Sequence, residues 1–116
     1  MRIAALAILA LLAVAPAAMA TPVGSYNVEG VNPGNDGTYR GTATVTRTGE
    51  TYRVVWVIEG TRIIGTGIGN DDFIAISIVS GRNAGIALLG ADGQNWTGPW
   101  ATANGTQVGA ERWVRR

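Results

Sequence analysis

The sequence predicts an all-β protein: a small eight-stranded antiparallel up-and-down barrel that follows a cleaved signal peptide. Glycine recurs throughout residues 21–116, and short stretches rich in Val, Ile, Thr and aromatic residues lie between the glycines, which is typical of strands and turns. No window of ten or more residues in this region has the apolar spacing of an amphipathic helix. The links between the stretches are too short for parallel crossover connections, so neighbours along the chain are expected to pair antiparallel.

Residues 1–20 have the pattern of a secretory signal peptide. Arg2 supplies the positive charge, residues 3–14 form an unbroken apolar run, and residues 18–20 (Ala-Met-Ala) form a small-x-small cleavage site. The apolar run is shorter than the about 20 residues of a membrane-spanning helix. We therefore expect an exported protein, periplasmic or secreted, with residues 21–116 as a single β-barrel domain.

Eight strand candidates follow in order, separated by turns rich in Gly, Asn and Asp. They cover residues 25–30, 38–46, 51–59, 62–68, 73–79, 85–89, 96–101 and 107–114. The spacing of about 12 residues per strand and turn is the one expected of small barrels and sandwiches. Residues 31–37 form the longest link. A sheet of this kind loses its exposed edges when the first strand meets the last, so closure into a barrel is expected.

Period-two alternation predicts which side chains fill the barrel. The inward sets are Tyr52, Val54, Trp56 and Ile58; Tyr39, Gly41, Ala43 and Val45; and Ile74, Ile76 and Ile78. The same register leaves Val55, Val57, Phe73 and Val79 on the outside. Because soluble monomers seldom expose a large apolar patch, we expect these four to form a surface for a partner or for homo-oligomerisation.

Composition excludes much chemistry. The sequence has no Cys, His or Lys, which removes disulfides, thiol or histidine catalysis and lysine Schiff bases. Residues 21–116 carry eight Arg and eight acidic residues, a balance that disfavours binding to nucleic acid or anionic membranes. The strands are shorter than those of membrane barrels and their inward faces are apolar, so the barrel is not expected to span a membrane. No enzyme activity, metal or cofactor is predicted.

Aromatic residues are the remaining candidates for a binding site. Tyr and Trp combine an apolar body with a polar group, which suits the lining of a barrel mouth. The candidate ligand- or partner-binding residues are Tyr39, Tyr52, Trp56, Trp96 and Trp100, with Arg40 and Arg53 as polar companions. The alternative is that these rings simply fill the interior of the barrel.

Several segments resemble a group of short exported bacterial β proteins, mostly uncharacterised, some of which are labelled fibronectin-binding protein. The resemblance rests on residues 24–33 (GSYNVEGVNP), 52–56 (YRVVW), 65–69 (GTGIG) and 109–113 (GAERW). It implies an exported β-rich binding protein. The predicted shape also resembles the avidin and lipocalin barrels, by analogy of fold only.

These observations favour an exported, non-enzymatic binding protein that recognises a protein partner, either a host matrix component such as fibronectin or a hydrolase that it inhibits. One alternative is a small-molecule carrier with an aromatic-lined barrel interior. Another is a carboxylate-dependent glycan hydrolase in which Asp72 meets Glu59 or Asp92 across a barrel mouth.

Overall fold

The computed structural model describes residues 21–116, so the predicted signal peptide lies outside the described part of the chain. The elements are β1 (Gly24–Val31), the short 3-10 turn η1 (Pro33–Asn35), β2 (Thr38–Thr48), β3 (Thr51–Ile58), β4 (Thr61–Gly69), β5 (Phe73–Ser80), β6 (Asn83–Asp92), β7 (Asn95–Thr102) and β8 (Gly109–Arg115).

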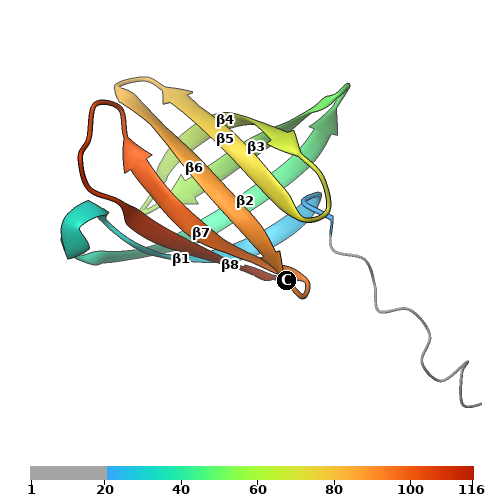
Figure 1. The fold of residues 1–116 in the computed structure, drawn as a ribbon, viewed down its shortest axis with the longest axis horizontal. Helices are drawn as coiled ribbons and strands as arrows, with labels where there is room; N and C mark the ends of the chain where they lie inside the picture. Colours follow the sequence, from blue (N-terminus) through green and yellow to red (C-terminus); the bar gives the residue numbers. More distant parts are fainter. Residues whose placement is uncertain (1–20) are drawn as a thin grey trace, which may run out of the picture.

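Each strand pairs antiparallel with the next, and β8 pairs antiparallel with β1, so the sheet closes into a barrel (Figure 1). This confirms the predicted all-β, eight-stranded antiparallel up-and-down fold. Closure satisfies the backbone groups that a free edge strand would leave unpaired. Within residues 21–116, no helix is long and apolar enough to cross a membrane.

All eight predicted strands are present, and they differ from the prediction at their ends. The sixth strand was predicted over residues 85–89 but runs from Asn83 to Asp92, because pairing with both neighbours extends it into residues of low β-propensity. The predicted third strand included Glu59, which instead has a φ of 50° and lies in the turn with Gly60. The last strand begins at Gly109 and not at residue 107.

The predicted alternation places the core correctly. Tyr52, Val54 and Trp56 of β3 are buried, as are Ile74 and Ile76 of β5. The other buried apolar core side chains are Tyr26, Val28, Ala43, Val45, Ala87, Leu89, Trp96 and Trp113. A few inward residues, Ile58, Ile63 and Ile78 among them, are only partly buried.

One end of the barrel is covered by two arginines, and we call it the closed end. It carries the start of β1, the β2–β3 turn and the C-terminus, on the right in Figure 1. The Arg115 guanidinium lies 4.8 Å from the ring centre of Tyr26 and donates to its hydroxyl at 2.8 Å. Arg47 lies 4.8 Å from the Tyr52 ring centre and donates to its hydroxyl at 2.8 Å. These contacts close that end of the core against solvent.

The opposite end, which we call the open end, carries η1 and the β3–β4, β5–β6 and β7–β8 connections. In Figure 1, η1 and the β7–β8 connection lie together on the left. The partly buried Tyr39, Ile58, Ile63, Ile78 and Trp100 pack at the margin of the core.

The outer wall carries more exposed apolar side chains than the sequence predicted. Of the four predicted residues, Val57, Phe73 and Val79 are exposed and Val55 is half-buried. The prediction omitted three other exposed apolar side chains of the strands, Ile68, Ile86 and Leu88, and two outside the strands, Val23 and Val108. In β6, which the sequence predicted over residues 85–89, Ile86 and Leu88 alternate with the buried Ala87 and Leu89 and therefore face outward.

Candidate functional site

Tyr39 reaches into the open end because two neighbouring strands give it room. It pairs with Gly30 of β1, and Gly30 pairs in turn with Glu111 of β8. A β-carbon on Gly30 would lie only 2.0 Å from the Tyr39 ring, so the ring lies directly across the glycine backbone. From there its hydroxyl donates to Oε1 of Glu111 at 2.7 Å.

Trp100 of β7 is positioned in the same way. It pairs with Gly109 of β8, and its Nε1 lies 2.7 Å from the place where a β-carbon on that glycine would sit. The Tyr39 and Trp100 rings meet edge to face, with 6.2 Å between their centres. This is a favourable arrangement of two aromatic rings. The Trp100 Nε1 is buried and has no hydrogen-bond partner in the described residues.

Glu111 is the one buried charged side chain of the described barrel, only 8% exposed. It accepts hydrogen bonds from the Tyr39 hydroxyl, from Trp56 Nε1 at 3.1 Å and from Trp113 Nε1 at 2.8 Å. Across residues 21–116, no cationic group lies within 4.0 Å of it, since the single ion pair there joins Arg112 to Asp92. The interior thus holds a carboxyl group that neutral donors surround.

Burial and hydrogen bonding shift the pKa of Glu111 in opposite directions. Burial raises the pKa of Glu111 above its usual value, and the hydrogen bonds from Trp113, Tyr39 and Trp56 oppose that rise. Burial, together with the neighbouring carboxylate, also raises the pKa of Tyr39. Tyr39 therefore keeps its proton and serves as a hydrogen-bond donor throughout the physiological range.

Sequence reasoning did not identify Glu111. The signal was present, because Gly109, Glu111 and Trp113 occupy alternate positions of one strand and so share its inward face. Because Gly109 and Trp113 are both buried, this alternation places the carboxyl group of Glu111 in the core as well.

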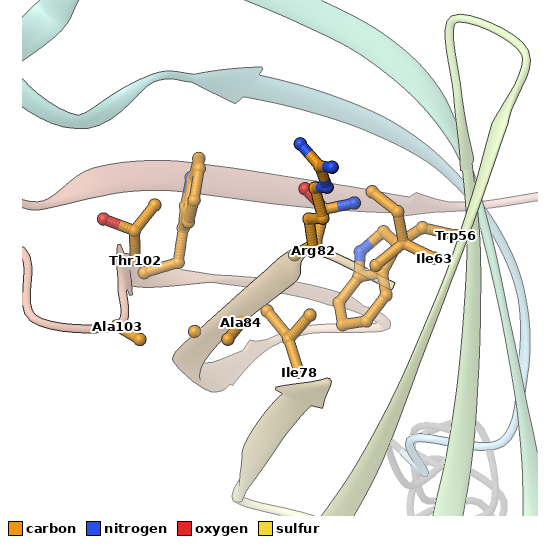
Figure 2. Close-up of a pocket in the computed structure, with 10 residues that line it drawn as sticks. Trp56, Ile63, Ile78, Arg82, Ala84, Thr102 and Ala103 are labelled. Carbon is orange, nitrogen blue, oxygen red and sulfur yellow. The ribbon is translucent and has the colours of Figure 1, made fainter. Parts of the chain in front are cut away.

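A cavity opens between these side chains and the connections of the open end. One part, of about 320 Å³, is lined by Trp56, Ile63, Ile78 and Trp100. Figure 2 shows Trp56 and Ile63 on one side of it, Thr102 and Ala103 on the other, and Ile78, Ala84 and Arg82 between them.

A second part, of about 250 Å³, is lined by Tyr39, Ile58, Ile63 and Trp100, with Glu59 among its polar residues. The two parts share Ile63 and Trp100 and therefore adjoin. We call them together the mouth cavity.

The structure brings three of the seven candidate residues together. Tyr39, Trp56 and Trp100 line the mouth cavity. Tyr52 is buried at the closed end beneath Arg47. Trp56 lies four positions further along the strand, which amounts to about 13 Å at the rise of a β-strand.

The other three candidates also lie away from the mouth cavity. Trp96 is fully buried beside Trp113, its pairing partner near the closed end. Arg40 and Arg53 are exposed on the outer wall, at positions that alternate with the inward residues. The structure therefore places the seven candidate residues at different heights and on both faces of the barrel wall. Alternation fixes the face of a side chain but not its height in the barrel.

The carboxylates named for a glycan hydrolase are also separated. Asp72 and Asp92 lie in or beside the turns of the closed end, whereas Glu59 lies in the β3–β4 turn of the open end. In residues 21–116, no three acidic side chains come close enough together to hold a metal ion.

Comparison with known proteins yields structural neighbours only. Neither the protein-family models nor the curated proteins contain a match to this chain. A redesigned β-barrel aligns with a TM-score of 0.62 at 17% identity, covering 81% of this chain and 91% of its own. A second redesigned β-barrel, mFAP1, solved bound to DFHBI, aligns with a TM-score of 0.57 at 20% identity, covering 81% of this chain and 94% of its own. At these identities the likeness shows the barrel fold.

Proposed function

We propose that this protein is a small-molecule-binding barrel that holds an apolar, ring-containing ligand in its mouth cavity. The observation that carries the proposal is the cavity itself, which opens at the end of the barrel opposite Arg47 and Arg115. It is lined by three aromatic rings and three isoleucines: Tyr39, Trp56, Trp100, Ile58, Ile63 and Ile78.

The size and lining of the cavity fit that role. Small-molecule sites are typically concave, about 300–1,000 Å³ in volume, and apolar with few polar groups. The inner wall here supplies apolar surface, and Arg82, Thr102 and Glu59 supply polar groups near the rim. The neighbour mFAP1 was solved with a small molecule bound, which supports ligand binding by a barrel of this fold.

The binding step follows from these side chains. A flat ring that enters between Trp56 and Trp100 leaves water and stacks on aromatic faces, and both effects favour association. The barrel is already formed, so little ordering is needed on binding. We propose that the ligand is held without chemical conversion and that the protein is exported, as residues 1–20 predict.

Binding of N-phenyl-1-naphthylamine, a neutral apolar fluorophore, tests the proposal. We expect its emission to rise and saturate on titration with residues 21–116. Ile78→Trp fills the mouth cavity from β5 and should weaken binding at least about tenfold, because the added ring occupies the ligand volume.

The matched control is Val79→Trp, the next residue along the same strand. Val79 is 74% exposed on the outer wall, so the same ring is added outside the barrel. Equal binding by the two variants, or no saturable binding by the unmodified protein, would show that the mouth cavity is not the site.

The outer wall favours a second candidate function, contact with another protein. The described barrel has no free sheet edge to which a partner could add a strand, because every strand already pairs with two others. Such contact must therefore use side chains. Ile68, Phe73, Ile86 and Leu88 are exposed on adjacent strands β4 to β6, whose outer faces meet through the pairs Ile68–Ala75 and Ala75–Leu88.

We propose that the occupant of this wall is a second copy of the chain. Between Phe73 and Ala110 the only charged residues are Arg82 and Asp92. Arg82 lies at the open-end turn of the β5–β6 hairpin, and Asp71 and Asp72 lie at its closed end. Two copies related by a two-fold axis, with their hairpins antiparallel, would place Arg82 of each beside the aspartates of the other.

A further inference from the structure

The rings that line the mouth cavity share a polar partner that lies behind the wall. Tyr39 and Trp56 both line the cavity, and both donate a hydrogen bond to the carboxyl group of Glu111. Trp113 supplies the third donor from the core side. A carboxyl group surrounded by three donors is held in the arrangement that suits its anion.

When Glu111 is ionised, no cationic side chain of the described barrel lies within 4.0 Å of it. The arginines at the closed end, Arg47 and Arg115, are engaged with Tyr52 and Tyr26. At the rim of the cavity, Arg82 and Glu59 are both exposed and carry opposite charges. Solvent screens exposed charges much more than a buried one. Solvent therefore screens an ionised Glu111 less than it screens Arg82 and Glu59.

Hydrogen bonding to the carboxylate also changes the rings themselves. Chains of hydrogen bonds polarise one another in a low-dielectric interior. A tyrosine hydroxyl or an indole N–H that donates to an anion leaves its ring richer in electrons. An electron-rich ring face attracts cations, and tryptophan is the best of the side chains in this respect.

We infer that the mouth cavity selects a cationic ligand, an organic ammonium group carried on an apolar body, with the faces of Trp56, Trp100 and Tyr39 as its contacts and Glu111 as the opposing charge behind them. This inference rests on the proposed function, since it names the chemical class of the ligand in the same cavity. Glu111 acts as a positioning and charge-setting residue and not as a direct contact.

A pair of isosteric probes tests the inference. Benzyltrimethylammonium and neopentylbenzene have the same shape and differ by one charge, and their Kd values are measured by displacement of N-phenyl-1-naphthylamine. Glu111→Gln should raise the ratio of the cation Kd to the neutral Kd by about tenfold or more, because it removes the opposing charge in a low-dielectric site. The two probes differ in hydration, but this difference is the same for both proteins. It therefore cancels when the Kd ratio of Glu111→Gln is divided by the Kd ratio of the unmodified protein.

Glu29→Gln is the matched control, because it removes the same charge from an exposed position on the outer face of β1. We expect it to leave the ratio unchanged. An equal ratio in the unmodified protein and in Glu111→Gln, or an equal shift in both variants, would overturn the inference.

A second measurement covers the case in which Glu111→Gln fails to fold. In the unmodified protein, benzyltrimethylammonium should move the indole N–H resonances of Trp56 and Trp113 more than neopentylbenzene does, since those protons bond to Glu111. Equal shifts overturn the inference while leaving small-molecule binding intact. Failure of all three compounds to bind overturns the proposed function itself.

Discussion

At the scale of single residues, Glu111 is the charged side chain that lies buried in the described barrel. Transferring a carboxylate from water into an apolar interior is unfavourable unless hydrogen bonds replace its hydration. Here three side chains from β2, β3 and β8 supply those bonds. A buried carboxyl group whose pKa is shifted by desolvation is typical of functional sites.

The raised pKa of Glu111 makes stability depend on pH. The folded protein holds this proton more tightly than the unfolded chain, whose carboxyl has its ordinary pKa of 4.5. The contribution to stability is therefore full below pH 4.5 and is lost as pH rises through the folded pKa. We expect the difference in unfolding free energy between Glu111→Gln and the unmodified protein to shift in favour of Glu111→Gln across that window.

Urea unfolding followed by tryptophan fluorescence at several pH values measures this difference. Glu29→Gln again serves as the control, since an exposed carboxyl should give a difference with little pH dependence. If Glu111→Gln shows the same pH profile as the unmodified protein, the carboxyl group does not change its protonation in this way.

At the scale of elements, the aromatic rings of the open end pack against glycines of β1 and β8. Gly30 receives the ring of Tyr39, and Gly109 receives the indole of Trp100. Large rings from one strand cover glycines of the next, which fills the space that the missing side chains leave. The shape of the mouth cavity therefore depends on glycines that touch no ligand.

Gly30→Ala should destabilise the protein by about 1–3 kcal/mol, the usual cost of overpacking. The added methyl would lie 2.0 Å from the Tyr39 ring and force it away, breaking its bond to Glu111. Urea unfolding and near-ultraviolet circular dichroism measure the two effects.

Gly90→Ala is the matched control for this change. A β-carbon at Gly90 would meet its nearest atoms only at 3.9 Å, an ordinary contact distance. We expect little loss of stability and an unchanged aromatic spectrum. Equal loss in the two variants would mean that contact with Tyr39 is not what excludes a side chain at position 30.

At the scale of the whole molecule, the barrel has two unlike ends and two unlike walls. One end is covered by Arg47 and Arg115, and the other opens into the mouth cavity. The outer faces of β5, β6 and β7 carry no charged residue between Phe73 and Ser80, Asn83 and Ala91, or Asn95 and Thr102. This division separates the mouth cavity that we propose for a ligand from the wall that we propose for a second copy.

We expect residues 21–116 to associate into dimers at micromolar concentration in sedimentation velocity. Ile86→Lys places a charge in the middle of the apolar wall and should shift the protein to monomer, because burying an unpaired charge is unfavourable. Thr44→Lys, exposed on β2, should leave the dimer intact. If the unmodified protein is strictly monomeric, the proposal that a second copy covers this wall is wrong.

Much of this architecture was predictable. Glycine-rich turns and period-two alternation predicted eight antiparallel strands and the inward positions of Tyr52, Val54 and Trp56. Alternation also indicated the outward Val57, Phe73 and Val79. The ends of the strands were less well predicted, because residues of low propensity join the sheet when a neighbouring strand offers a partner, as β5 does for Asn83 and β7 does for Asp92.

The sequence by itself determined the fold class and the face of most side chains, since a strand has only two faces and one of them must be buried. Only the tertiary structure decided which end of the barrel is open and which residues meet there. Tyr39 and Trp56 lie 72 and 55 residues from Glu111 along the chain, yet all three join in one network. Barrel closure and the stagger of the strands set the position of each side chain along the barrel axis. Neither can be predicted from the alternation pattern of a single strand.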